Sequence, residues 1–181
     1  MRSGTILWLA MWAAATWLGG CGEPPLRISG PDAVLPKDDG SPGFLDRISS
    51  APDVSENDAM RAVLMLLDGE DAAENFQQRV RTLADRKIVD RTWRHDADRS
   101  VTKGKLAYMI YQACGVPGGV MLQLTGPSQR YCLRELQYRG MIGAGAVTSR
   151  VSGMELVASM GRADEYRQTG EVPDVLKTGE D

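Results

Sequence analysis

The sequence has few residues of the kinds that build catalytic and metal sites. Among 181 residues there is one histidine, His95, and only three cysteines, with no Cys-x-x-Cys pair. A catalytic histidine needs an orienting partner and usually a nucleophile, and no serine motif stands near His95. The aspartates around it lack the spacing of a calcium loop. We therefore expect no enzyme active site, no metal and no cofactor, and we place His95 in a solvated loop.

The chain also lacks an apolar run long enough to cross a bilayer. Its apolar stretch, residues 6–18, has thirteen residues, whereas a membrane-spanning helix needs about 20. Arg2 precedes this stretch and small residues follow it, which is the pattern of an export signal. The stretch ends in Leu18-Gly19-Gly20-Cys21. This phrase resembles the bacterial lipobox, in which an aliphatic residue and two small residues precede a cysteine.

The lipobox resemblance implies a lipoprotein. Residues 1–20 would be the signal peptide, and Cys21 would carry the lipid and become the new N-terminus. Two or three acyl chains hold a protein durably in a membrane, since each buried methylene contributes about 0.8 kcal/mol. The mature chain would be attached to the cell envelope without a transmembrane helix. Gly22 is not the aspartate that retains lipoproteins in the inner membrane of enteric-type bacteria, which favours the outer membrane.

A strong positive charge is absent as well. The net charge is −3, and it becomes −4 once Arg2 is removed with the signal peptide, which argues against nucleic acid as a partner. Six of the nine prolines lie in residues 22–53. We expect residues 21–53 to be a disordered tether, with a short helical turn at Phe44, Leu45 and Ile48 that docks on the domain. Residues 167–181 are polar and are expected to form a flexible tail.

Between tether and tail, over residues 54–166, the chain repeats itself. The phrases Val54-Ser55, Val101-Thr102 and Val151-Ser152 each precede a helical pattern of apolar residues, and the Ser or Thr is placed to cap that helix. A second phrase recurs without gaps, as residues 80–89 and residues 133–142. Each copy reads as the end of a helix followed by a buried apolar pair, with Gly140 suited to the left-handed position after the second helix.

This unit resembles the S-layer homology module of bacterial envelopes. The resemblance rests on two kinds of phrase. The first is Arg86-Lys87-Ile88-Val89 and Arg139-Gly140-Met141-Ile142, and the second is residues 101–106 and 151–156. The resemblance implies an all-α, compact bundle of about three helix-loop-helix units around a pseudo-threefold axis. It also implies attachment to a cell-wall polymer, either peptidoglycan or a secondary cell-wall polysaccharide.

In that family a basic residue after the Ser or Thr helps to grip an anionic glycan. The corresponding residues here are Glu56, Lys103 and Gly153, so only Lys103 fits the pattern. Lys103, Arg139 and Arg86 are accordingly the candidate ligand-binding cations.

The two cysteines that follow the signal leave alternatives open. Cys114 and Cys132 are either buried thiols that pack as small hydrophobes or a structural disulfide, since exported proteins retain such bonds. A sugar-stacking surface is a further alternative, with Tyr108 and Tyr111 as a partner-facing edge; its candidate residues are Trp93, Tyr108, Tyr111, Tyr131 and Tyr138. The glycines of residues 115–119 are expected to form a turn between two helices.

The sequence thus favours a non-enzymatic envelope lipoprotein that binds a cell-wall polymer or an envelope protein. The alternatives are a periplasmic enzyme or enzyme accessory, and a structural subunit of an envelope complex. A cleft with convergent titratable groups would favour an enzyme, whereas an exposed apolar face would favour a subunit.

The lipoprotein prediction is tested by replacing Cys21→Ser. A hydroxyl cannot form the thioether to the lipid, so the variant should lose all label when cells are grown with a fatty-acid analogue. Label that persists on the Cys21→Ser protein would contradict the prediction.

Overall fold

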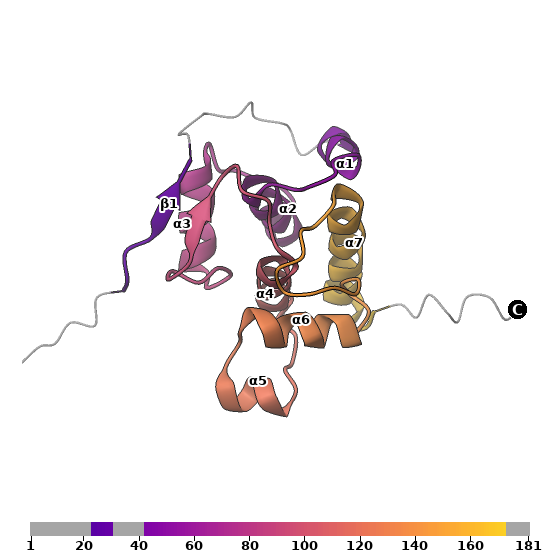
Figure 1. Ribbon diagram of the computed structural model, residues 1–181. Helices are drawn as coiled ribbons and strands as arrows, with labels where there is room; N and C mark the ends of the chain where they lie inside the picture. The colour runs from indigo at the N-terminus through magenta and orange to yellow at the C-terminus, as the bar shows by residue number, and fades with distance from the viewer. Residues whose placement is uncertain (1–22, 31–41, 173–181) are drawn as a thin grey trace, which may run out of the picture.

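A computed structural model describes residues 23–30 and 42–172 of the chain (Figure 1). The predicted signal peptide, the lipobox-like phrase with Cys21, and the part of the predicted tail from residue 173 onward lie outside the described residues. In chain order the elements are β1 (Arg27–Ser29), α1 (Pro42–Ser49), α2 (Glu56–Asp68), α3 (Phe76–Asp85), β2 (Arg94–Asp96), α4 (Lys103–Cys114), α5 (Val120–Thr125), α6 (Gln129–Tyr138) and α7 (Gly153–Thr169).

The three capped helices form where the sequence predicts them. Ser55, Thr102 and Ser152 are the N-caps of α2, α4 and α7, and each side chain accepts a hydrogen bond from the backbone N–H three residues later. Such a bond satisfies one of the free donors at a helix start. Leu106 and Leu156 are both fully buried, which confirms the predicted apolar faces of α4 and α7.

The valines before these caps join the three helices into a ring. Val54 N–H donates to the Val151 carbonyl at 2.9 Å, Val101 to Val54 at 2.8 Å, and Val151 to Val101 at 3.3 Å. All three side chains are fully buried. Each valine therefore bonds both others, and this closed set of backbone bonds defines a pseudo-threefold axis at the centre of the fold.

The second repeated phrase is also reproduced in the backbone. Ile88 N–H bonds the Leu83 carbonyl at 2.8 Å, and Met141 N–H bonds the Leu136 carbonyl at the same distance. Gly140 has a positive φ of 71°, as predicted, and its counterpart Lys87 has a φ of 60°. Lys87 is the one residue other than glycine with positive φ in the described part of the chain, which marks the same turn in both copies.

Helix α1 is the first helix of a unit, at the place where the sequence predicts only a short docking turn. It packs against α7, as α3 packs against α2 and α6 packs against α4. The three units are therefore α1–α2, α3–α4 and α6–α7, and each first helix covers the capped helix of the preceding unit. Phe44 is fully buried and Ile48 nearly so, in agreement with the predicted docking turn. The helical domain thus begins at residue 42 rather than at residue 54.

The segment expected to be a tether also contributes a strand, which corrects the all-α prediction. β1 pairs with β2 in parallel, with Arg27 opposite Arg94, Ile28 opposite His95 and Ser29 opposite Asp96. The strand pairs with a segment 67 residues away in sequence, so nothing in its local pattern reveals it. Residues 27–29 and 42–49 are therefore folded parts of the domain.

Two smaller differences concern α5 and α7. The glycine-rich segment 115–119, expected to be a turn between two helices, leads into the additional short helix α5. Helix α7 continues to Thr169, three residues into the predicted tail. Among the described residues, none of the helices is long and apolar enough to span a membrane.

Substitution of Gly153 tests the packing of α1 against the start of α7. A Cβ at this position would lie 1.5 Å from the Ile48 carbonyl oxygen, whereas one at Gly161, on the same helix, would meet no atom within 4 Å. Gly153→Ala should therefore lower the free energy of unfolding by about 1–3 kcal/mol, as overpacking does. Gly161→Ala should raise it by about 0.5–1 kcal/mol. Urea unfolding of both variants measures this, and equal midpoints would contradict the packing of α1.

Candidate functional site

Lys103, the predicted glycan-gripping residue, is used inside the fold. Its ammonium lies 2.6 Å from Glu155 Oε1 and donates to the Ala144 carbonyl at 2.6 Å. The residue is 8% exposed. The amine is held by these partners, and Lys103→Glu would place two carboxylates together instead of altering only the surface. Lys103 thus has a structural role within the fold, and its binding of a ligand stays a prediction.

Arg139 and Arg86 occupy equivalent positions after α6 and α3, and each has partners of its own. Arg139 Nε pairs with Glu135 Oε1 at 2.8 Å, and its Nη2 donates to the Pro117 carbonyl. Arg86 forms a solvent-exposed ion pair with Asp68, with the two charged groups 2.8 Å apart. The three predicted cations thus belong to three separate ion pairs and do not assemble into one site.

The ion pairs of Lys103 repeat around the axis with the charges exchanged. Glu56, one residue after the first cap, accepts from Lys105 Nζ at 2.6 Å, and Lys105 lies three residues after the second cap. Lys103 and Glu155 hold the corresponding two positions at the next interface between units. Gly153 holds the third position, where the end of α1, at Ile48 and Ser49, leaves no room for a side chain. The residue directly after each helix cap therefore lies at a contact between two units of the ring.

Lys105 lies off the predicted apolar face of α4, which predicts exposure to solvent, but in the structure it belongs to a buried cluster. Besides the Glu56 carboxylate, its ammonium donates to the Arg94 carbonyl at 3.0 Å and lies 5.7 Å from the centre of the Trp93 ring. Glu56 is 1% exposed. Removing Lys105 would leave a buried carboxylate without its cation, which is far more destabilising than a surface change.

His95 lies beside this cluster and is fully buried, so the solvated-loop prediction is wrong. Its Nε2 lies 3.4 Å from the Asp90 carbonyl oxygen, and its Nδ1 lies 4.0 Å from Glu56 Oε2 without a hydrogen bond. Burial, and next the positive charge of Lys105, lower the pKa of His95 from 6.5 to about 4. With no exposed surface, the ring cannot touch a substrate, and it acts as a neutral core residue.

The two cysteines are free thiols in the structure. Cys132 is fully buried in α6, and the Cys114 thiol lies 3.7 Å from the Ala163 carbonyl oxygen. Burial raises the pKa of Cys114 to about 11 and that of Cys132 to about 12. Both thiols therefore stay protonated at neutral pH and have little nucleophilic character. The disulfide alternative is not formed.

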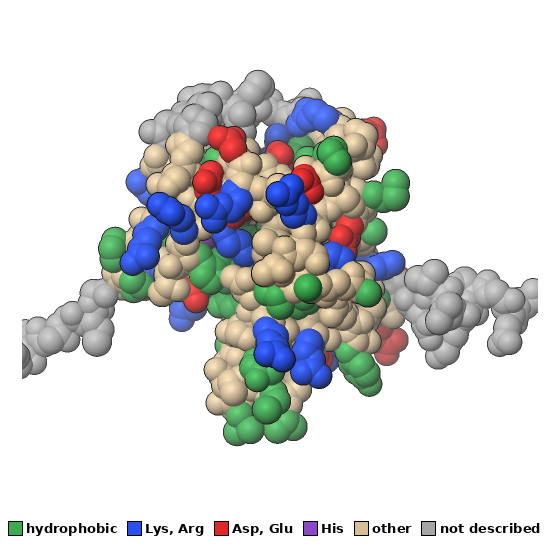
Figure 2. All heavy atoms as spheres, in the orientation of Figure 1, with side chains coloured by type: hydrophobic (Ala, Val, Ile, Leu, Met, Phe, Trp, Pro, Cys, Tyr) green, Lys and Arg blue, Asp and Glu red, His purple; other side chains and the backbone are tan. Residues whose placement is uncertain are grey.

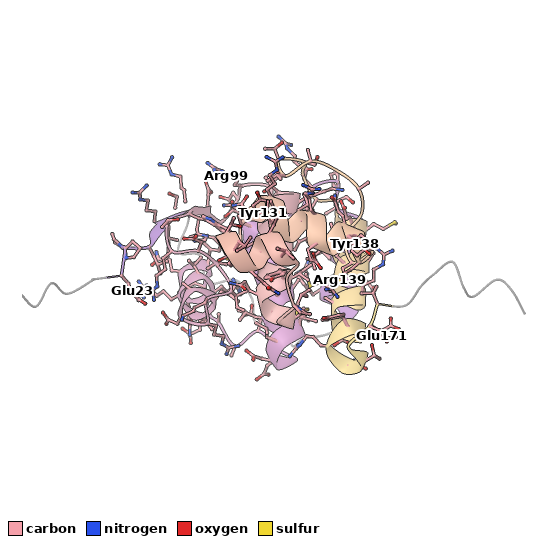
Figure 3. All side chains as sticks on the ribbon, turned by 90° about the horizontal axis from the view of Figure 1, so that it is seen from below. Glu23, Arg99, Tyr131, Tyr138, Arg139 and Glu171 are labelled. Carbon is pink, nitrogen blue, oxygen red and sulfur yellow. The ribbon has the colours of Figure 1, made fainter. Side chains whose placement is uncertain are left out.

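Exposed arginines gather over the two-stranded sheet, where the sequence indicated no site (Figure 2). We call Arg27, Arg94 and Arg99 the basic face. Strand pairing sets Arg27 and Arg94 side by side, both exposed. Among the described residues, no acid forms an ion pair with either of these two. Arg99, at the edge of the molecule in Figure 3, lies 3.9 Å from Asp96 and is half exposed.

Exposed apolar and aromatic side chains gather at a second surface, around α5 and the neighbouring face of α6. Tyr131 and Tyr138 line a groove of about 380 Å³ with Met121 and Arg134. Trp93 and Tyr108, by contrast, pack edge to face with ring centres 4.9 Å apart, and Tyr108 is buried. The aromatic residues thus do not form one continuous sugar-stacking surface.

Comparisons with family models, with curated proteins and with solved structures found no match to this chain. Within the described residues there is no group of three or more His, Cys, Asp or Glu side chains that could hold a metal ion. The described surface carries the basic face over the sheet and exposed apolar side chains at α5.

The burial of His95 predicts how stability depends on pH. His95 takes up a proton near pH 6.5 in the unfolded chain but only near pH 4 in the folded protein. The free energy of unfolding therefore has its full value above pH 6.5 and decreases as the pH is lowered from 6.5 to 4. The loss should be about 1 kcal/mol per pH unit. Urea unfolding between pH 4 and 7 measures it. His95→Gln should remove most of this slope, and a slope unchanged in that variant would contradict the assignment.

Proposed function

We propose that this chain is a non-enzymatic envelope lipoprotein whose three-unit bundle binds an anionic cell-wall polymer through the basic face. The attachment to the membrane is the lipid on Cys21 implied by the lipobox phrase. The outer membrane, in its periplasmic leaflet, is the proposed location. The observation that carries the binding proposal is the side-by-side placement of Arg27 and Arg94, two exposed guanidinium groups without an acidic partner among the described residues.

The arrangement of the units supports the relation to S-layer homology modules. Three helix pairs surround a pseudo-threefold axis, and each capped helix begins at a Val-Ser or Val-Thr phrase. Polymer attachment is the typical role of such bundles. In this chain the residues after the caps join the units to each other, so we propose that the gripping cations have moved outward to the sheet.

Guanidinium groups suit this ligand. Each presents a planar fork of donors that matches the geometry of a carboxylate or a phosphate, the acidic groups of wall polymers. Asp96 is engaged with the Asp98 backbone N–H and with Arg99, which leaves Asp98 as the exposed acid beside the basic face. Arg27 comes from the segment next to the proposed lipid and Arg94 from the middle of the chain. Binding therefore requires the folded sheet.

Co-sedimentation with purified sacculi tests the polymer proposal. The chain from residue 21, carrying Cys21→Ser so that no lipid interferes, should sediment with sacculi. Replacing Arg27→Ala and Arg94→Ala together should reduce the bound fraction about tenfold or more, because each charged hydrogen bond contributes about 1.5–3 kcal/mol. Binding should also weaken with salt, since free charges are screened beyond about 8 Å at physiological ionic strength.

Matched changes serve as controls. Arg162→Ala removes the same charge from α7, away from the sheet, and should leave sedimentation unchanged. Asp98→Asn should strengthen it, because an opposing charge is lost. Absence of binding by the parent chain, or equal loss in the Arg162→Ala variant, would remove the polymer proposal and favour an envelope protein as the partner.

A further inference from the structure

Helix α5 presents aliphatic side chains to the solvent at the end of a projection. Val120 is 71% exposed, Met121 55% and Leu124 76%, and we call these three residues the α5 tip. Leu122, on the opposite side of the helix, is 7% exposed and fixes α5 to the body of the protein. Figure 1 shows α5 beyond α6, away from the other helices, and Figure 2 shows apolar side chains at this end.

The segment that carries the tip is free of charge. No Asp, Glu, Lys or Arg occurs between Lys105 and Arg130. The two polar side chains of α5 are satisfied by nearby backbone: Gln123 Nε2 donates to the Gly118 carbonyl at 3.1 Å, and Thr125 Oγ1 donates to the Met121 carbonyl at 2.7 Å. A polar group that already has a partner loses less on leaving water, so this projection can enter an apolar medium at low cost.

Cations and aromatic side chains border the tip. Arg134 lines the groove beside Met121, and Arg130 lies about one turn before it on α6; both are exposed, and neither forms an ion pair with a described acid. Tyr131, Arg134 and Tyr138 follow one face of α6 at helical spacing, and Tyr138 is 90% exposed (Figure 3). The acid on this face, Glu135, is already paired with Arg139 at 2.8 Å. The border of the tip therefore carries an uncompensated positive charge.

We infer that the α5 tip inserts into the interface of an anionic lipid bilayer. Aliphatic residues at the end, tyrosines at their border and arginines behind them follow the order of acyl chains, interface and headgroup phosphates in a lipid leaflet. Arg134 also lines the 380 Å³ groove beside Met121, where a headgroup phosphate can reach it. The membrane would thus be contacted twice, by the lipid proposed on Cys21 and by α5.

A convex projection favours lipid over a second protein surface. Stable protein interfaces are broad and shape-complementary and carry many hydrogen bonds, whereas the side chains of the α5 tip offer no donor or acceptor. The negative charge of the whole chain opposes an anionic surface, but the two bordering arginines act within the screening distance of about 8 Å. Insertion of the aliphatic side chains then adds a contribution that salt does not weaken.

Sedimentation with lipid vesicles tests this inference, again with the Cys21→Ser chain from residue 21, so that any binding is independent of the attached lipid. Vesicles of phosphatidylglycerol and phosphatidylethanolamine should bind the parent chain. Val120→Asp with Leu124→Asp should reduce binding at least tenfold, because two aliphatic side chains no longer enter the bilayer. Arg130→Ala with Arg134→Ala should reduce binding to these vesicles several-fold and remove its dependence on phosphatidylglycerol content.

Met154→Asp is the matched control. Met154 is 72% exposed on α7 and is not part of the tip, so its replacement by aspartate should leave vesicle binding unchanged. Equal binding by the Val120→Asp, Leu124→Asp chain, or no binding by the parent, would overturn the inference. Dimerisation that the tip variants abolish, in the absence of vesicle binding, would assign the tip to a second copy of the chain. Neither result depends on whether sacculi are bound through the basic face.

Discussion

Three valines that hydrogen-bond one another through the backbone hold this fold together. Val54, Val101 and Val151 each donate an N–H to one of the others and accept from the remaining one. A buried backbone group without a partner is costly, so each unit satisfies its central residue only when the other two are present. The ion pairs at the unit interfaces and the packing of each first helix on the preceding unit are arranged around this shared centre.

The same constraint places the residues after the helix caps at the interfaces between units. Residues one position after the caps face the neighbouring unit, and this chain fills those places with Glu56 and Lys103, paired with Lys105 and Glu155 across two interfaces. At the third place Gly153 has no side chain, because the end of α1 occupies the space. Opposite charges at equivalent places allow similar backbones to meet in a defined order, and surface chemistry is left to the sheet and to α5.

Local features of the fold could be predicted from the sequence, and non-local ones could not. Helix caps and apolar stripes depend on neighbouring residues, so Ser55, Thr102 and Ser152 were found from spacing alone. β1 and the basic face depend on a strand pairing across 67 residues, which leaves no mark in a three-residue strand. The ion pair of Lys103 could not be predicted for a related reason, because its acidic partner Glu155 is 52 residues away in sequence. In the sequence, a basic residue after a helix cap has the same pattern whether its side chain faces a ligand or another unit.

The packing of α1 on α7 has a consequence for how the chain acquires its structure. In linear repeat proteins, folding starts at one unit and spreads to its neighbours. Here the first helix of the domain is covered by the last, more than a hundred residues later, so the ring is incomplete until the C-terminal helix is available. A chain that leaves the ribosome, or crosses a membrane, from its N-terminus thus lacks a finished core until nearly all of it has emerged. Such a delay would suit the export that we propose for this chain, because a chain that crosses a membrane in the unfolded state must not complete its core early.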